Sequence, residues 1–195
     1  MGKIKDELEE LRAGQAVTVG GKDLTVKFAA TLHELCQQNG SKEWVPNGRQ
    51  SRAIMLADGR WMLRFHTKEG GGYTWLLATV KDGSSSFSQF YKGGDSPADW
   101  GPARKFARSE QKDDVRYDLY NREWKLADIG AIEIESDGES EMLENGDRIH
   151  FVTSQDRESG DWLIYLDARH SEAKGTGAMM LGQELDPESA IEGIL

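Results

Sequence analysis

Residues 17–26, Val-Thr-Val-Gly-Gly-Lys-Asp-Leu-Thr-Val, decide the fold class of this chain. Apolar and polar side chains alternate on both sides of Gly20-Gly21, which is the period of a half-buried strand interrupted by a two-residue hairpin turn. The same arrangement returns 100 residues later in residues 117–126, Tyr-Asp-Leu-Tyr-Asn-Arg-Glu-Trp-Lys-Leu. Apolar positions, charged positions and the turn all correspond. The chain is therefore predicted to be mainly β and antiparallel.

A second correspondence lies further along each half. Phe65 precedes residues 73–77, Tyr-Thr-Trp-Leu-Leu, and Phe151 precedes residues 160–164, Gly-Asp-Trp-Leu-Ile. This order predicts two similar antiparallel β units, as bent sheets or partial barrels, packed side by side because each is too small to be stable alone. The alternative stays open that any two antiparallel hairpins share such alternation and turns.

The segments around these units complete the predicted organisation. Ile4, Leu8 and Leu11 recur at helical spacing among charged residues and predict a short amphipathic helix. A stretch rich in Gly, Asp, Ser and Pro marks a break between the units. The predicted order is an N-terminal helix at 1–13, a first β unit at 14–92, a linker at 93–114 and a second β unit at 115–195.

The composition bears on location and partners. Cys36 is the single cysteine, and neither a secretory leader nor an apolar run of the roughly 20 residues that cross a bilayer is present. We therefore expect a cytoplasmic protein without membrane insertion. Its 34 acidic and 24 basic residues give a formal net charge of −10, which repels phosphate backbones. Nucleic acid is not an expected partner.

No set of residues with the spacing of a catalytic, metal or cofactor site stands out. Cys36 lies three residues after His33 without a third group to form a triad, and the four histidines lack the close pair that clamps zinc. Glu133, Glu135 and Asp137 fall on one strand face, which a solvated hairpin explains. The sequence predicts no cofactor and favours a protein that is not an enzyme.

The tryptophans Trp61, Trp75, Trp124 and Trp162 fall within predicted strands. Because a buried indole removes a large apolar area from water, we expect these four side chains to lie in the core. Stacking on a ligand is the alternative for one of them.

One basic stretch departs from the acidic average. In residues 100–108, Trp-Gly-Pro-Ala-Arg-Lys-Phe-Ala-Arg, the proline could begin a short helix with basic side chains beside an apolar stripe. Such a segment could dock an acidic protein partner, or it could close the linker against a β unit. The candidate partner-binding residues are Trp100, Arg104, Lys105, Phe106 and Arg108.

Several short motifs resemble an uncharacterised bacterial family, domain of unknown function 4178. In the first half these are Ala13-Gly14-Gln15-Ala16-Val17 and Trp75-Leu76-Leu77. In the second half they are Trp124-Lys125-Leu126, Gly130-Ala131-Ile132-Glu133-Ile134, Gly138-Glu139, the run from Asn145 to Phe151 and the run from Leu181 to Pro187. The resemblance implies a β-rich bacterial protein, often encoded near membrane-stress proteins of the phage-shock type, and it supplies no catalytic residue.

These observations lead to two expectations of function. The first is a non-catalytic protein-interaction or accessory module of a bacterial cytoplasmic system related to membrane stress. The alternative is a hydrolase or small-ligand-binding protein whose site assembles from distant strands, which spacing along the chain does not reveal.

Overall fold

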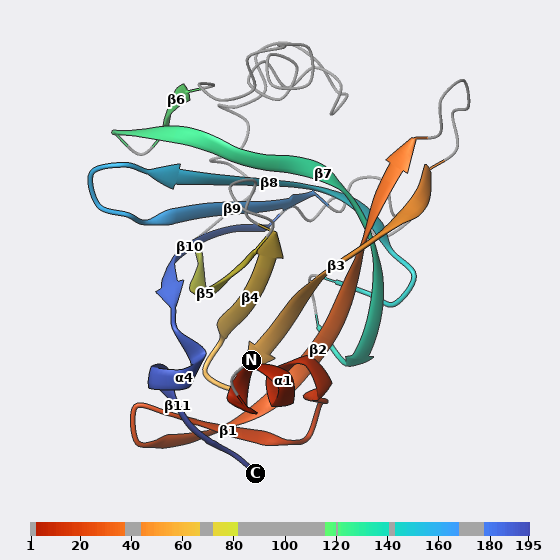
Figure 1. Ribbon diagram of the computed structural model, residues 1–195, viewed down its shortest axis with the longest axis vertical. Coiled ribbons are helices and arrows are strands. Elements are labelled where there is room, and N and C mark those ends of the chain that lie inside the picture. The colour runs from red at the N-terminus through yellow and green to blue at the C-terminus, as the bar shows by residue number, and fades with distance from the viewer. Residues whose placement is uncertain are drawn as a thin grey trace.

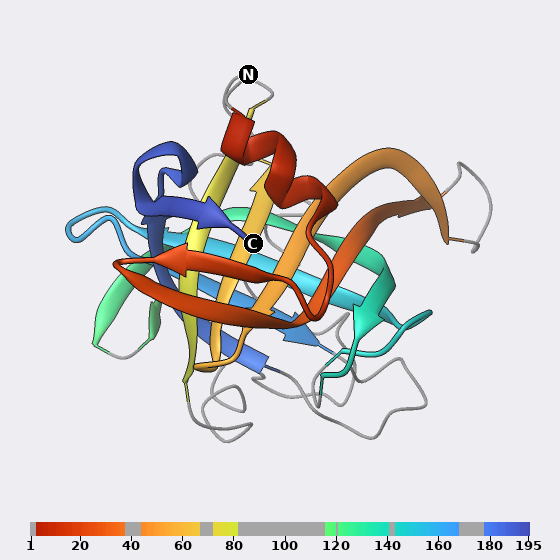
Figure 2. The ribbon, with the colours of Figure 1, turned by 90° about the horizontal axis from the view of Figure 1, so that it is seen from below.

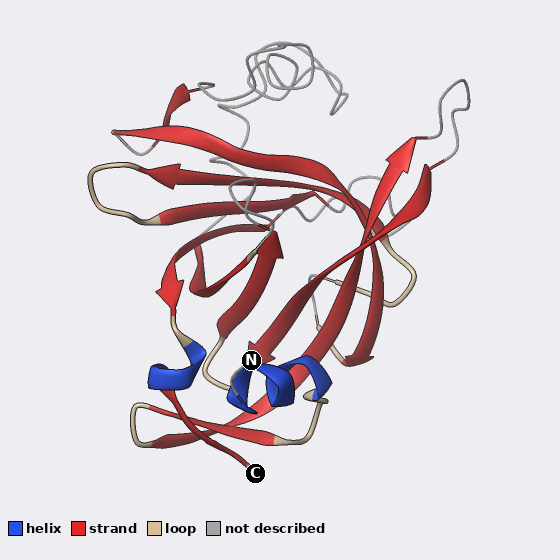
Figure 3. Cartoon of the chain, viewed as in Figure 1, coloured by secondary structure: helices blue, strands red, loops and turns tan. Residues whose placement is uncertain are grey.

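The computed structural model describes residues 3–37, 44–66, 72–81, 116–119, 121–140, 143–167 and 178–195. The protein is mainly β and antiparallel with a short N-terminal helix, α1 (Lys3–Glu10), which confirms the predicted fold class (Figures 1 and 3). The first half contains β1 (Ala16–Val19), β2 (Lys22–Gln37), β3 (Trp44–Leu56), β4 (Arg60–His66) and β5 (Tyr73–Lys81). The second half contains β6 (Arg116–Leu119), β7 (Arg122–Gly138), β8 (Arg148–Asp156), β9 (Trp162–Asp167), β10 (Ala178–Leu185), the turn α4 (Pro187–Ala190) and β11 (Ile191–Ile194).

Eight of the described strands close into a ring. The strand order is β11-β1-β2-β3-β4-β5-β10-β9-β8-β7-β6, and an additional pairing joins β2 to β7. The ring therefore runs β2-β3-β4-β5-β10-β9-β8-β7 and returns to β2, with four strands from each half (Figure 1). Closure pairs the edges that β2 and β7 would otherwise expose.

The two halves share their strand registers at the predicted offset. Val17 pairs with Leu24 in the first hairpin, and Tyr117 pairs with Trp124 in the second. A register shift follows in both halves, between Val26 and Phe28 in β2 and between Leu126 and Asp128 in β7. The hairpins at 17–26 and 117–126 thus occupy corresponding places in the strand order. A duplication as the origin of this likeness stays a prediction.

The second correspondence proposed from the sequence is wrong. Strand order matches β4 with β9 and β5 with β10, so residues 73–77 of β5 do not correspond to residues 162–164 of β9. Phe65 of β4 and Phe151 of β8 are likewise not equivalent, and their rings instead stack at 5.7 Å between centroids. Alternation alone misled the comparison, because every half-buried strand has the same period of two.

The ring is filled by apolar side chains from both halves. This core includes Trp61, Trp162, Phe28 and Phe151, and the four strand tryptophans are all buried, at 0–8% exposure, as predicted. A second core lies outside β2–β5, where Leu8 and Leu11 pack with Ile54 and Met62 under α1, β1 and β11. Figure 2 shows α1, β11 and the β1–β2 hairpin crossing this outer face. The predicted linker at 93–114 lies outside the described residues.

Candidate functional site

The two ends of the ring carry opposite chemistry at corresponding positions. Phe28 pairs with Met55 directly after the register shift of β2, and Asp128 pairs with Thr153 directly after that of β7. Further along the strands, corresponding inward-facing positions again hold an apolar side chain in one half and a polar side chain in the other. We name the apolar end by Phe28, Met55, Ile134 and Ile149, and the polar end by Asp128, Thr153, Glu34 and Ser51.

An open cavity of about 1090 Å³ lies at the apolar end. Its apolar lining consists of Val26, Met55, Trp61, Val80 and Leu143, and Val80 is 43% exposed although it is a large aliphatic residue. Polar side chains surround this floor: Thr25, Lys27, Ser136, Glu139, Ser140, Glu144 and Asn145. The described lining therefore combines a hydrophobic floor with a hydrogen-bonding rim, which is the composition typical of small-molecule sites.

The turn after β7 builds one wall of this cavity. Gly146 N donates to Ile134 O at 2.7 Å, and Ile134 N donates to Asp147 O at 2.9 Å. Asn145 Oδ1 accepts from Ser136 N at 3.0 Å. These bonds hold the turn against the end of the ring, where Leu143 is buried to 2% exposure. The wall is thus formed before any ligand arrives, which reduces the entropic cost of binding.

At the polar end, a carboxylate occupies an inward-facing position. Glu34 pairs across β2–β7 with Ile132, a member of the ring core, and is 7% exposed. Among the described residues it accepts a long hydrogen bond from Asn47 Nδ2 at 3.5 Å. Burial raises the pKa of Glu34, and the Asn47 hydrogen bond and the charge of Arg49 only partly oppose that rise.

Ser51 adds an unsatisfied hydroxyl to the polar end. It pairs with Leu32 of the ring core and is 1% exposed, and its Oγ has no hydrogen-bond partner among the described residues. A buried polar group without a partner costs about 1–3 kcal/mol. Neither Glu34 nor Ser51 was singled out from the sequence, because only the register of β2 with β3 and β7 places them inside the ring.

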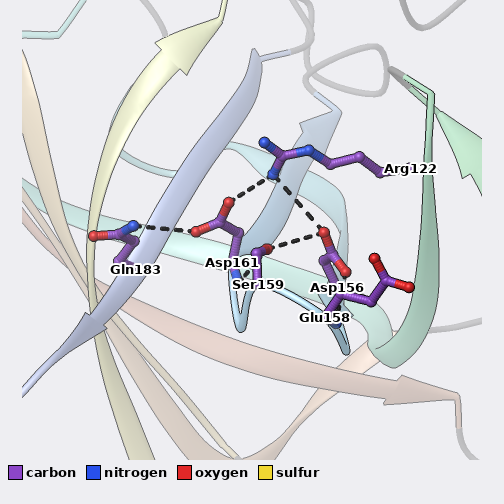
Figure 4. A network of polar contacts seen from close by, with 6 residues as sticks. All are labelled: Arg122, Asp156, Glu158, Ser159, Asp161 and Gln183. Carbon is purple, nitrogen blue, oxygen red and sulfur yellow. Dashed lines mark hydrogen bonds and ion pairs between the residues drawn. The ribbon is translucent and has the colours of Figure 1, made fainter.

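A separate polar network joins β7, the β8–β9 turn and β10. It comprises Arg122, Asp156, Glu158, Ser159, Asp161 and Gln183 (Figure 4). Arg122 Nη1 lies 2.6 Å from Asp161 Oδ2, and Gln183 Nε2 donates to Asp161 Oδ1 at 3.2 Å. These contacts lower the pKa of Asp161, with the Arg122 hydrogen bond as the largest cause. Because both carboxylate oxygens of Asp161 already accept hydrogen bonds, we interpret the network as a structural contact that holds these strands together.

The neighbouring Asp156 is held in the same way. Glu158 N donates to its Oδ1 at 2.9 Å, and Ser159 Oγ donates to its Oδ2 at 2.9 Å. These two hydrogen bonds, the backbone one first, lower the pKa of Asp156. Such side-chain bonds to nearby backbone are typical of turns that connect strands.

Two arginines on the outer face of β3 and β4 anchor the helix. Arg52 Nη2 donates to the carbonyl oxygen of Leu11, and Arg64 Nη1 forms an ion pair with Glu9. A cavity of about 670 Å³ lies beside Arg64 and is also lined by Tyr73, whose ring centroid is 4.0 Å from the Arg64 guanidinium carbon. Because these cations already hold α1, we assign them a structural role.

The residues considered from the sequence do not form one site. His33 Nε2 lies 2.8 Å from Glu135 Oε2, and Arg148 Nη2 lies 2.6 Å from Glu133 Oε2, on the outside of the ring. Cys36 is exposed. The described residues contain no group of three or more His, Cys, Asp or Glu placed to hold a metal ion. The candidate partner-binding residues at 100–108 lie outside the described residues.

Comparisons with family models, with curated proteins and with solved structures find no match to this chain. The resemblance to domain of unknown function 4178 therefore stays a prediction. Within the described ranges, no helix is both long and apolar enough to cross a membrane.

Proposed function

We propose that this protein binds a small, predominantly apolar molecule at the apolar end of the ring, without catalysing a reaction. The observation that carries the proposal is the open cavity of about 1090 Å³ with Met55, Trp61, Val80 and Leu143 on its floor. Ligand sites commonly enclose about 300–1,000 Å³ and occur at the ends of closed strand rings. The site would be assembled from distant strands, as the alternative expectation from the sequence required.

The rim indicates which ligands fit. Glu139 and Glu144 face the cavity together with one cation, Lys27. Within a chain of net charge −10, this balance favours a neutral or cationic polar group over an anionic one. The described lining holds no histidine or cysteine, so the candidate general bases beside Ser136 and Ser140 are the carboxylates Glu139 and Glu144. We propose binding because the cavity and its apolar floor support it directly.

A fluorescence titration tests the proposal. N-phenylnaphthylamine is a neutral apolar probe that brightens when it leaves water, and we expect saturable binding to the wild-type chain. Val80→Lys places a charge in the cavity and should weaken binding by about tenfold or more, since burying an aliphatic side chain contributes about 1.5–3 kcal/mol.

Thr79→Lys is the matched control. Thr79 is exposed and adjacent to Val80 on β5, but its side chain points to the opposite face of the strand. We expect it to bind the probe as the wild type does. Equal weakening by both substitutions, or no saturable binding by the wild type, would contradict the proposal.

A protein-interaction role remains the second proposal. The sequence observation that favours it is the basic stretch with Trp100, Arg104 and Arg108 in an otherwise acidic chain. In that role the chain would act as an accessory module of a bacterial cytoplasmic system related to membrane stress. A charge-reversed variant, Arg104→Glu with Arg108→Glu, should lose a partner recovered by the wild type from native lysate while probe binding is retained.

A further inference from the structure

The polar end departs from what folding alone requires of those positions. Corresponding strand positions at the apolar end hold Ile134 where the polar end holds Glu34, and Ile149 where it holds Ser51. Ile134 and Ile149 are both buried in the ring core at 1% exposure. Aliphatic side chains therefore fit this geometry. Local choices that oppose the demands of packing are typical of functional sites.

The second pair of corresponding positions shows the same departure. Phe28 and Met55 at the apolar end correspond to Asp128 and Thr153 at the polar end. Thr153 is 1% exposed and Asp128 is half-buried. Four inward-facing positions are thus polar at one end and apolar at the other, although strand pairing is the same at both.

Glu34 and Ser51 leave hydrogen-bonding capacity unused in one place. An ionised carboxylate offers about four acceptor sites, and within the described residues Glu34 accepts one long hydrogen bond, from Asn47. Ser51 pairs with Leu32, and Glu34 is the next inward-facing residue on β2. The β2–β3 register shifts between His33 and Leu35, but Glu34 stays on the inward face because it pairs with Ile132 of β7. One small group with several donors can therefore reach both.

We propose that the polar end is a second binding site, which takes the primary ammonium group of a small molecule between Glu34 and Ser51. An ammonium group has three N–H donors and no acceptor, which matches the two carboxylate oxygens of Glu34 and the hydroxyl oxygen of Ser51. Asn47, the hydrogen-bond partner of Glu34, is exposed. This site is distinct from the cavity at the apolar end.

No ion pair among the described residues balances the charge of Glu34. Arg49 acts on it electrostatically, but Arg49 is exposed and does not lie within 4.0 Å of the carboxylate. The carboxylate of Glu34 therefore remains available to a ligand. Charge complementarity of this kind selects between ligands of similar size.

Calorimetric titration with butylammonium chloride tests the site, with butanol as the uncharged probe of the same length. We expect the wild type to bind butylammonium and to show no saturable heat with butanol. Glu34→Gln keeps the shape of the side chain and should weaken butylammonium binding by about tenfold or more, because hydrogen bonds to charged groups are the stronger ones. Ser51→Ala should weaken binding by about two- to tenfold.

Glu135→Gln is the matched control, since Glu135 lies on the outer face of β7 beside His33 and should not alter butylammonium binding. Wild-type-like binding by Glu34→Gln would overturn the proposal, as would equal binding of butanol and butylammonium by the wild type. Thermal unfolding of each variant checks that it is folded. Glu34→Gln should bind N-phenylnaphthylamine as the wild type does. A negative result with butylammonium would therefore leave the proposal for the apolar end unaffected.

Discussion

Gly138 should be the glycine least tolerant of substitution among those whose neighbours are described. It ends β7 with φ +86°, a conformation that side chains with a Cβ rarely adopt. A Cβ added there would overlap the carbonyl oxygen of Lys27 and lie 2.6 Å from the Cβ of Ala13. Left-handed backbone costs about 1–2 kcal/mol and overpacking about 1–3 kcal/mol, so Gly138→Ala should lose about 2–5 kcal/mol of unfolding free energy.

Gly59→Ala separates these two costs. Gly59 has nearly the same φ, +84°, but no atom lies within 4 Å of an added Cβ. It should therefore lose only the backbone part, about 1–2 kcal/mol. Urea unfolding of both variants and the wild type, followed by far-ultraviolet circular dichroism, gives the comparison. Equal losses at Gly138 and Gly59 would refute the close approach of β7 to Lys27 and Ala13.

Three further predictions concern the core and the titrating groups. Trp75→Ala and Trp162→Ala should each lose about 3–5 kcal/mol in denaturant unfolding, and an unchanged midpoint in both would contradict their burial. Folding lowers the pKa of Asp161 below its usual 3.8, so this group stabilises the protein above pH 3.8 and the contribution disappears as pH falls through the lowered value. The unfolding free energy of Asp161→Asn should therefore fall less steeply with decreasing pH than that of the wild type. The same pH dependence in both proteins would contradict the Arg122 contact. Folding raises the pKa of Glu34 above 4.5, so the charged form destabilises the fold as pH rises through the raised value. Glu34→Gln should unfold at higher denaturant than the wild type at pH 7 and should lose that advantage below pH 4.5.

The first correspondence between the halves could be found without a structure because it rests on a complete hairpin. Residues 17–26 and 117–126 each contain two alternating strands and a turn, and a turn fixes the pairing register of the strands that it joins. The second correspondence lacked such a marker. It compared single strands with the same period of two. The strand order shows that the counterpart of β5 in the second half is β10 and not β9.

The candidate sites were less accessible to sequence reasoning. Val80 and Leu143 are ordinary apolar residues of the printed sequence, and only the closure of β2 onto β7 brings them to the same end of the ring with Trp61. Glu34 stands between His33 and Leu35 in the sequence, and a charged residue there gives no sign of burial. Its inward position follows from pairing with Ile132, almost 100 residues away.

By itself, the sequence determined the mainly β class, the N-terminal helix, the leading hairpin of each half and the burial of the strand tryptophans. These features depend on contacts between residues near each other in the chain or on the period of apolar side chains. The tertiary structure alone decided the closure of the ring, the cavity at the apolar end and the buried carboxylate at the polar end. Each of these depends on pairing between distant strands, which alternation permits in many registers and only packing of the whole core selects.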